Sequence, residues 1–286
     1  MSSPQPLTGY NYEFFNVEQA GEWVAHLEIN RPRKLNAFSQ PVWQEFGRVF
    51  EQLSKDSRVR VVVLSGAGER AFTSGLDVQA AAQSGPLTSN GEGLDAARKA
   101  KSTRAHIEEF QSCVSAMERC EKPVICVLHG VSIGLAIDIA CCADVRLCSS
   151  DTRFAVKEVD IGLAADIGTL ARLPKVVGTM GWVKEVCMTA RDFGASEAAS
   201  VGFVSRVHGT KAEALAAGIK LAEVLASKSP VAVQSTKELL NYGRDHGVAD
   251  SLRYTAVWNS VALQASDVPM ALMSSMQRSK PTFEKL

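Results

Sequence analysis

Three acidic residues in the middle third of the chain have the chemistry to exchange protons with a substrate. They are Asp138, Glu158 and Asp166, and Asp138 lies in a segment otherwise made of Ile, Leu, Ala and Cys, where a charge is costly unless it is paired or used. Carboxylates in a dry pocket have raised pKa values and can exchange protons at carbon. Two of them, one at each end of a conjugated chain, could move a proton along it. Spacing alone leaves two alternatives open, because Asp166 could cap a helix and Glu158 could belong to an ion pair.

Two turns that contain glycine could supply backbone N–H groups to a ligand. Residues 71–77 (AFTSGLD) follow a predicted buried strand, and residues 129–138 (HGVSIGLAID) lead into a predicted helix. The first N–H groups of a helix have no partner within it, so they can hold an anion or an enolate oxygen. Gly130 and Gly134 do not match the dinucleotide or P-loop spacing, which makes a nucleotide cofactor a weak interpretation. Ordinary packing turns are the alternative for both segments.

The elements that must position these residues alternate between strand and helix. Strands are predicted at residues 23–29, 59–64, 124–128 and 145–148, with helices from residue 39, at 102–120 and up to about 143. This alternation predicts an α/β fold with mostly parallel pairing. Residues 79–100 are rich in Ala, Gly and Ser, which predicts a surface loop or insert. Helices at 211–227, 230–245, 250–265 and 267–278 follow. We therefore predict a core at residues 1–205 and a helical region at 206–286 for packing or assembly.

The composition excludes several classes of protein. The 286 residues carry 31 basic and 31 acidic side chains, so the formal net charge is zero and neither a nucleic acid nor a membrane surface is an expected partner. No apolar window is long enough for a transmembrane helix, and the N-terminus lacks an apolar signal core. The seven cysteines lie mostly in apolar runs without a CxxC pair, which predicts buried, reduced thiols.

Several of these segments together resemble the crotonase superfamily, which has the enoyl-CoA hydratase/isomerase fold. Residues 31–37 (RPRKLNA) resemble its CoA-binding stretch, and residues 71–77 and 129–138 resemble its two oxyanion-hole loops. The resemblance implies a crotonase-like ββα spiral core with a C-terminal helical region. Residues 156–170 (VKEVDIGLAADIGTL) and 252–259 (LRYTAVWN) are similar in particular to the Δ3,5-Δ2,4-dienoyl-CoA isomerases.

This resemblance implies a role for each candidate residue. Glu158 would be the base near C2, Asp166 the acid near C6, and Asp138 a residue that orients the pocket. The thioester oxygen would accept from the backbone N–H groups of Ser74 and Leu135. The CoA part would lie against Lys34, Leu35, Ala37, Ser74, Gly75, Leu76 and Asp77. The implied reaction moves the double bonds of a 3,5-dienoyl-CoA to the 2,4 positions during fatty acid β-oxidation, without a metal or a redox cofactor.

Other members of the superfamily remain alternatives. A 2-enoyl-CoA hydratase uses two glutamates, whereas this chain has Asp138 at one of those positions and Asp166 where hydratases usually carry glycine. A specialised crotonase of secondary metabolism and a non-catalytic acyl-CoA-binding protein are further alternatives. The usual Gly-Gly-Gly of the second loop is Gly134-Leu135-Ala136 here, so the side chain of Leu135 needs room.

The resemblance also bears on assembly and location. Crotonases are typically trimers or dimers of trimers, so a homotrimer or homohexamer is expected. The sequence ends in Glu284-Lys285-Leu286, which is similar to the peroxisomal address Ser-Lys-Leu. We therefore expect the peroxisomal matrix, with the cytoplasm as the alternative and mitochondria less favoured.

Overall fold

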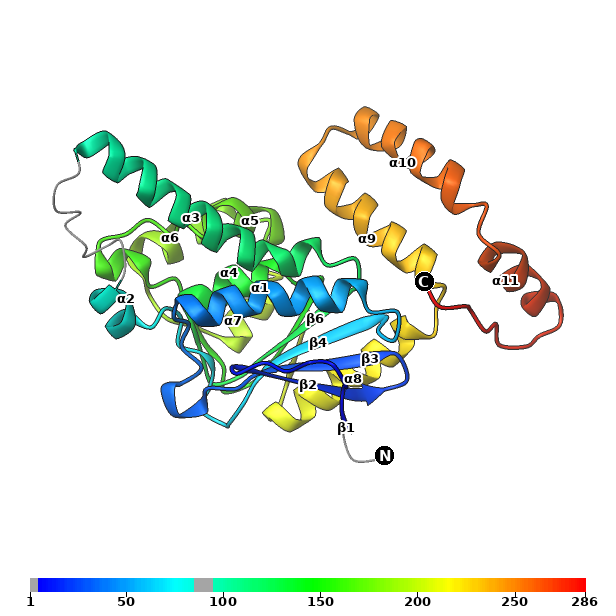
Figure 1. Cartoon of the computed structure of the whole chain (residues 1–286), viewed down its shortest axis with the longest axis horizontal. Coiled ribbons are helices and arrows are strands. Elements are labelled where there is room, and N and C mark those ends of the chain that lie inside the picture. The colour runs from blue at the N-terminus through cyan, green and yellow to red at the C-terminus, as the bar shows by residue number, and fades with distance from the viewer. Residues whose placement is uncertain (1–4, 85–94) are drawn as a thin grey trace.

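A seven-stranded sheet forms the centre of the molecule (Figure 1). The computed structural model describes residues 5–84 and 95–286. The strands lie in the order β1 (Gln5–Pro6), β2 (Phe15–Gly21), β3 (Val24–Ile29), β4 (Val61–Gly66), β6 (Val124–Leu128), β8 (Val145–Ser149) and β11 (Arg206–His208). Pairing is parallel from β3 to β11 and antiparallel among β1, β2 and β3. The predicted α/β class with mostly parallel pairing is confirmed.

Helices cover both faces of this sheet, and the two faces differ in the size of the side chains that the helices bury against it. On one face α1 (Gln40–Lys55) buries Phe46, Phe50 and other large side chains, and it packs against α3 (Ala96–Arg119). On the other face α8 (Lys211–Ala226) uses small residues at every fourth position: Ala214, Gly218, Ala222 and Ala226. A Cβ on Gly218 would lie 3.0 Å from Val127 Cγ2, so glycine lets this helix approach the sheet closely.

A second sheet of four short strands carries the turns that point to the candidate site. Its order is β10 (Phe193–Gly194), β9 (Arg153–Ala155), β7 (Val131–Ile133) and β5 (Ala71–Thr73). The short elements α4 (Leu135–Cys142), η2 (Glu158–Ile161), α5 (Thr169–Val176), α6 (Met180–Thr189) and α7 (Ala195–Ser200) follow or flank these strands. Strand β5 leads into α2 (Val78–Ser84), and η1 (Pro32–Lys34) follows β3. Parallel pairing of β5 with β7 therefore brings both glycine turns to one edge.

The last three helices form an arm that extends from the core: α9 (Pro230–Asp245), α10 (Val248–Ala262) and α11 (Asp267–Met276) (Figure 1). Polar contacts dock α9, since Lys237 Nζ lies 2.9 Å from Asp144 Oδ2 and donates to the Lys122 carbonyl at 3.0 Å. None of the residues of α10 is buried. The predicted boundary at residues 205 and 206 falls just before β11 and α8, whereas the arm begins at α9.

The long elements agree with the sequence-based expectations. All four strands and the four C-terminal helices form close to the expected ranges, and α1 begins after Ser39 as expected. Residues 85–94 of the expected insert lie outside the described residues, and α2 and α3 flank them. Six of the seven thiols are buried, and all seven are free. Among the described helices, none is long and apolar enough to cross a membrane.

Candidate active site

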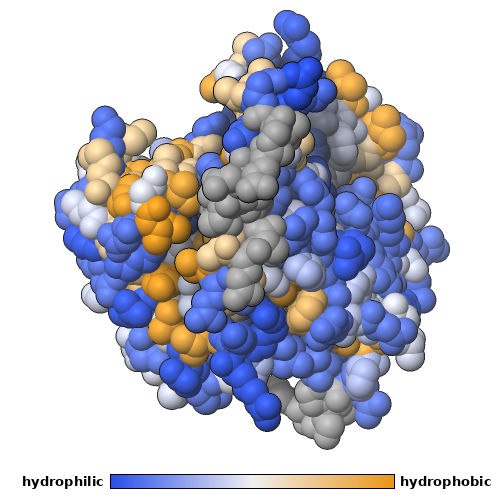
Figure 2. All heavy atoms as spheres, turned by 60° about the vertical axis from the view of Figure 1, so that its left-hand side comes forward, coloured by the Kyte–Doolittle hydropathy of each residue, from blue (hydrophilic) through white to orange (hydrophobic). Residues whose placement is uncertain are grey.

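One cavity of about 740 Å³ brings the predicted catalytic residues together. Asp138, Glu158 and Asp166 all line it, as does the turn at residues 74–77. Apolar side chains from α3 and neighbouring segments form much of the remaining wall: Ile107, Phe110, Ile133, Ile161, Leu163 and Ile167. In Figure 2 hydrophobic residues, drawn in orange, gather on the left of the face turned forward. The cavity thus joins acid–base groups to an apolar wall.

Asp138 is the most deeply enclosed of the three carboxylates. It lies in the first turn of α4 with only 1% of its surface exposed. Its Oδ1 accepts a hydrogen bond of 2.6 Å from the Thr169 backbone N–H at the start of α5. Burial, and then the negative charge of Glu158, raise the pKa of Asp138 to about 7, while the Thr169 bonds and Arg172 act in the opposite direction. Asp138 therefore joins two helix N-termini behind the cavity.

Glu158 begins the 3₁₀ helix η2 and is half-buried. Burial is the main cause that raises its pKa, and the Asp166 carboxylate adds to this effect. Its buried Oε2 has no hydrogen-bond partner among the described residues, and its Oε1 would lie 3.6 Å from a Cβ on Gly134. An unpartnered carboxylate oxygen with a raised pKa is suited to accept a proton in the cavity.

Asp166 differs from the other two because its side chain is exposed to solvent. Its backbone carbonyl accepts from Gln111 Nε2 of α3 at 2.6 Å. The alternative role of Asp166 as a helix cap is wrong: the residue that caps α5 is Gly168, and Asp138 receives the Thr169 N–H. No local pattern indicates the contacts from Gln111 and Thr169, because they join segments more than 30 residues apart in the sequence.

The two glycine turns supply backbone N–H groups, but in the first turn the free N–H group differs from the predicted one. The Ser74 N–H donates to the Leu35 carbonyl at 2.9 Å, so its predicted role in an oxyanion hole needs correction. Within the described residues, no hydrogen bond uses the N–H of Leu76 or Leu135. A Cβ on Gly75, whose φ is +89°, would lie 3.4 Å from the Leu135 nitrogen. The two free N–H groups therefore lie on adjoining turns.

The segments expected to bind CoA lie beside each other. Besides the bond from Ser74 to Leu35, Phe38 donates to the Gly75 carbonyl and Asp77 donates to the Phe38 carbonyl, at 2.8 and 2.9 Å. Of the predicted CoA-binding residues, those that line the cavity are Ser74, Gly75, Leu76 and Asp77. Lys34 is exposed, Leu35 is half-buried and Ala37 is buried. The structure thus places residues 34–37 along the edge of the cavity rather than in its wall.

The two sheets, the enclosed carboxylates and the paired turns define an α/β enzyme of the crotonase type. The chain belongs to the enoyl-CoA hydratase/isomerase family, whose model matches residues 19–285. It is 43% identical over 287 residues to the mitochondrial Δ3,5-Δ2,4-dienoyl-CoA isomerase of Mus musculus, covering 99% of this chain and 86% of that one. It is 41% identical over 263 residues to the peroxisomal Δ3,5-Δ2,4-dienoyl-CoA isomerase of Arabidopsis thaliana, covering 92% and 93%.

A solved structure confirms the fold. The enoyl-CoA hydratase of Bacillus anthracis superposes with a TM-score of 0.84 at 24% identity and covers 95% of this chain and 99% of its own. At this identity the similarity concerns the architecture alone. The crotonase-like core expected from the sequence is therefore confirmed.

Proposed function

We propose that this protein converts a 3,5-dienoyl-CoA into its 2,4-dienoyl isomer by proton transfer. Glu158 takes a proton from C2, the electron pair moves along the conjugated chain as a dienolate, and Asp166 delivers a proton to C6. The observation that carries this proposal is that Glu158 and Asp166 line one cavity, where burial raises the pKa of Glu158 and the Asp166 carboxylate adds to this effect. The names of the curated relatives support the same reaction.

The backbone N–H groups of Leu76 and Leu135 are proposed to bind the thioester oxygen. Both lack a partner within the described chain, and both lie at the turns that meet beside Gly75. Two fixed donors aimed at a developing negative charge stabilise an enolate more strongly in an enclosed site than in water. The adjoining residues 74–77 would contact the CoA portion, and the apolar wall would contact the acyl chain. The transfer needs no metal or redox cofactor, because it moves only a proton and an electron pair within the substrate.

Ultraviolet absorbance tests this proposal directly. A 3,5-dienoyl-CoA should gain the absorption of the 2,4-dienoyl product when the protein is added, while a 2-enoyl-CoA is hydrated slowly or not at all. Rapid hydration without isomerisation would instead identify a 2-enoyl-CoA hydratase. Tight acyl-CoA binding without either reaction would identify a non-catalytic binding protein.

Isotope labelling separates the two carboxylates in the same assay. Because Asp166 is exposed, its proton should exchange with water between turnovers, so a reaction in D₂O should place deuterium at C6 of the product. Failure to incorporate one deuterium at C6 in a single turnover in D₂O, with the protein equilibrated beforehand, would contradict Asp166 as the donor.

The arm is proposed to bury its apolar side chains in a homotrimer or homohexamer. Exposed side chains along α10 and α11 include Leu252, Val257, Val261, Leu272, Met273 and Met276, and apolar surface of this extent is typical of an assembly interface. Light scattering coupled to gel filtration measures the mass. A monomer at micromolar concentration would contradict this role of the arm.

A peroxisomal location is proposed from the Lys-Leu ending and from the plant relative, whose name includes that organelle. The mammalian relatives are named as mitochondrial, so the lower rank that we gave to mitochondria gains no support from the curated proteins. Microscopy of the whole chain with and without a Leu286→Asp substitution distinguishes the two organelles.

A further inference from the structure

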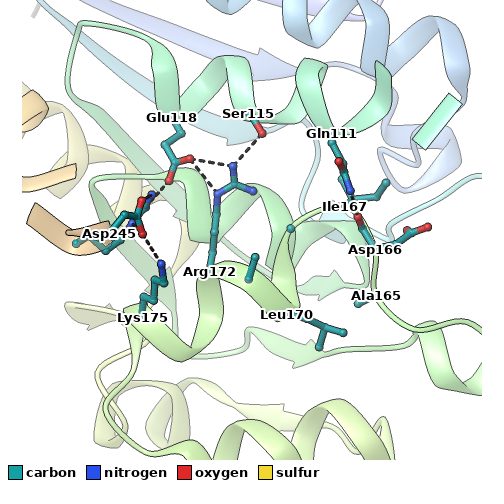
Figure 3. A pocket seen from close by; sticks show the side chains of 13 residues that line it. Gln111, Ser115, Glu118, Ala165, Asp166, Ile167, Leu170, Arg172, Lys175 and Asp245 are labelled. Carbon is teal, nitrogen blue, oxygen red and sulfur yellow. Dashed lines mark hydrogen bonds and ion pairs between the residues drawn. The ribbon is translucent and has the colours of Figure 1, made fainter. Parts of the chain in front are cut away.

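A second cleft lies behind the segment that carries Asp166. Its volume is about 400 Å³, and residues 165–168 line it together with side chains from α3, α5 and α9. Asp166 and Ile167 line both cavities, so this segment is the wall between them. Figure 3 shows Asp166 on one side of the cleft, Lys175 and Asp245 on the other, and Arg172 between them.

Arg172 is the centre of an ion network in this cleft. Its Nη2 donates to Ser115 Oγ and to Glu118 Oε2, both at 2.8 Å, and its Nε donates to the same carboxylate oxygen at 3.1 Å (Figure 3). The Arg172 and Glu118 side chains are only 14% and 16% exposed. Several charge-assisted bonds to a rigid, planar guanidinium fix its position.

Glycine at position 168 lets this guanidinium reach the back of the active site. A Cβ on Gly168 would overlap Arg172 Nη1 and would lie 3.8 Å from Asp138 Oδ1. The cation and the buried carboxylate therefore approach the same glycine. Thr169, whose N–H donates to Asp138, directly follows Gly168. Asp166 lies two residues before Gly168.

We propose that Arg172 is a positioning residue: anchored by Ser115 and Glu118, its guanidinium packs against Gly168 and holds the segment that presents Asp166 and the Thr169 N–H. This inference rests on the proposed isomerase function. It makes Arg172 part of the support of the carboxylates, without contact to the substrate.

The network also joins this support to the C-terminal arm. The second oxygen of Glu118 accepts from Arg244 of α9, and Asp245 of α9 pairs with Lys175 of α5. Because one carboxylate holds both Arg172 and Arg244, the docking of α9 and the position of the guanidinium depend on each other.

The charges around Asp138 give this role a measurable signature. On its own helix α4 Asp138 has the neighbouring thiols Cys141 and Cys142; Glu158 faces it from η2, Cys187 from α6 and Arg172 from α5. Burial and Glu158 favour the neutral carboxyl, whereas Arg172 favours the ionised form. Removal of a nearby cation raises the pKa of a carboxyl, here by about one unit at most, because burial and Glu158 have the larger effects on Asp138.

The test compares Arg172→Gln, Arg172→Lys and Glu118→Gln with Arg58→Gln as the matched control. Arg58 also pairs with a carboxylate, Asp56, at 2.6 Å, and it lines neither cavity. Turnover of a 3,5-dienoyl-CoA, the melting temperature and the infrared carboxyl band that Asp138→Asn removes are measured for each variant.

Arg172→Gln should lower kcat by about 10-fold to 100-fold with little change in KM, because misplaced catalytic groups cost this much, and the Asp138 midpoint should rise by up to about one unit. Arg172→Lys should restore the midpoint but only part of kcat, since an ammonium cannot replace the planar fork. Glu118→Gln should give an intermediate loss of kcat, and Arg58→Gln should match the parent. A lower melting temperature with unchanged kcat and midpoint would overturn the proposal. If the parent protein does not isomerise dienoyl-CoA, the proposed function fails, and the infrared midpoints alone then decide whether Arg172 acts on Asp138.

Discussion

Relative to the parent protein, Asp138→Asn should gain stability as the pH rises, while the substitution impairs the site. Asp138 is buried, and its pKa is raised from 3.8 to about 7. A carboxyl with a raised pKa in the folded state binds its proton more tightly there than in the unfolded chain. Stability is therefore lost as the pH rises from about 4, where the unfolded chain ionises, and the loss is complete above about 7.

The size of this loss follows from the two pKa values. A difference of roughly three pKa units, each worth about 1.36 kcal/mol, corresponds to about 4 kcal/mol at pH values above 8. At about pH 5 less than half of this cost, roughly 2 kcal/mol, is present by the same relation. The stability of Asp138→Asn relative to the parent protein should therefore rise by roughly 2 to 3 kcal/mol between about pH 5 and about pH 8. Any fixed cost of the amide cancels in this comparison, including a donor left without a partner.

Urea unfolding followed by tryptophan fluorescence at the two pH values, at one protein concentration, measures this difference. Asp56→Asn is the matched control, because the Arg58 guanidinium holds the pKa of Asp56 at about 2. Asp56 is ionised at both pH values whether the chain is folded or unfolded, so its substitution should change stability equally at both. If the free energies of unfolding of Asp138→Asn and the parent differed by the same amount at both pH values, ionisation of Asp138 would not destabilise the folded protein, and the reasoning would be refuted.

Three further experiments test the site and the arm. Glu158→Gln should lower kcat by about 10²-fold to 10⁴-fold, the usual contribution of a general base, and binding of the product CoA ester, measured by calorimetry, should persist. Leu135→Pro removes one proposed oxyanion donor at the first position of α4, where proline is tolerated; kcat should fall by about 10²-fold to 10³-fold, whereas Leu135→Ala keeps the N–H and most of the activity. Leu252→Asp together with Val261→Asp should reduce the mass measured by light scattering to that of one chain. Unchanged kcat or mass would count against each role.

The long elements could be predicted because their patterns repeat over many residues. The apolar spacing in α1 and the buried run of β4 are visible in the sequence, as are the breaks that end them. Strands β5, β7 and β9 have three residues each, which is too short for a period to appear. Their pairing is nevertheless what brings the two glycine turns together, so the geometry of the site was beyond reach.

The free donors of the site depended on tertiary contacts that no local pattern shows. Ser74 and Leu76 lie two residues apart in one turn, and both offer an N–H group. The carbonyl of Leu35, nearly 40 residues away, occupies the first and leaves the second free. In the same way the Thr169 N–H, and not any neighbour in the sequence, decides how Asp138 is held. The sequence could identify the turns and the carboxylates as candidates. Which of their N–H groups and oxygens are free to bind a substrate depends on the tertiary structure.

The different surroundings of the carboxylates are what the proposed reaction needs in order to repeat. After one proton shift Glu158 carries a proton and Asp166 has lost one, so the pair must be reset before the next substrate. Glu158 is half-buried and its pKa is raised, so it can hold the proton from C2 while the shift takes place and must release it before the next turnover. Asp166 is exposed and lies between the two cavities, so it can recover a proton from water. A pair buried to equal depth would lack this contact with water and would have to return the proton internally, so the exposure of Asp166 is what allows the proposed pair to be reset by solvent.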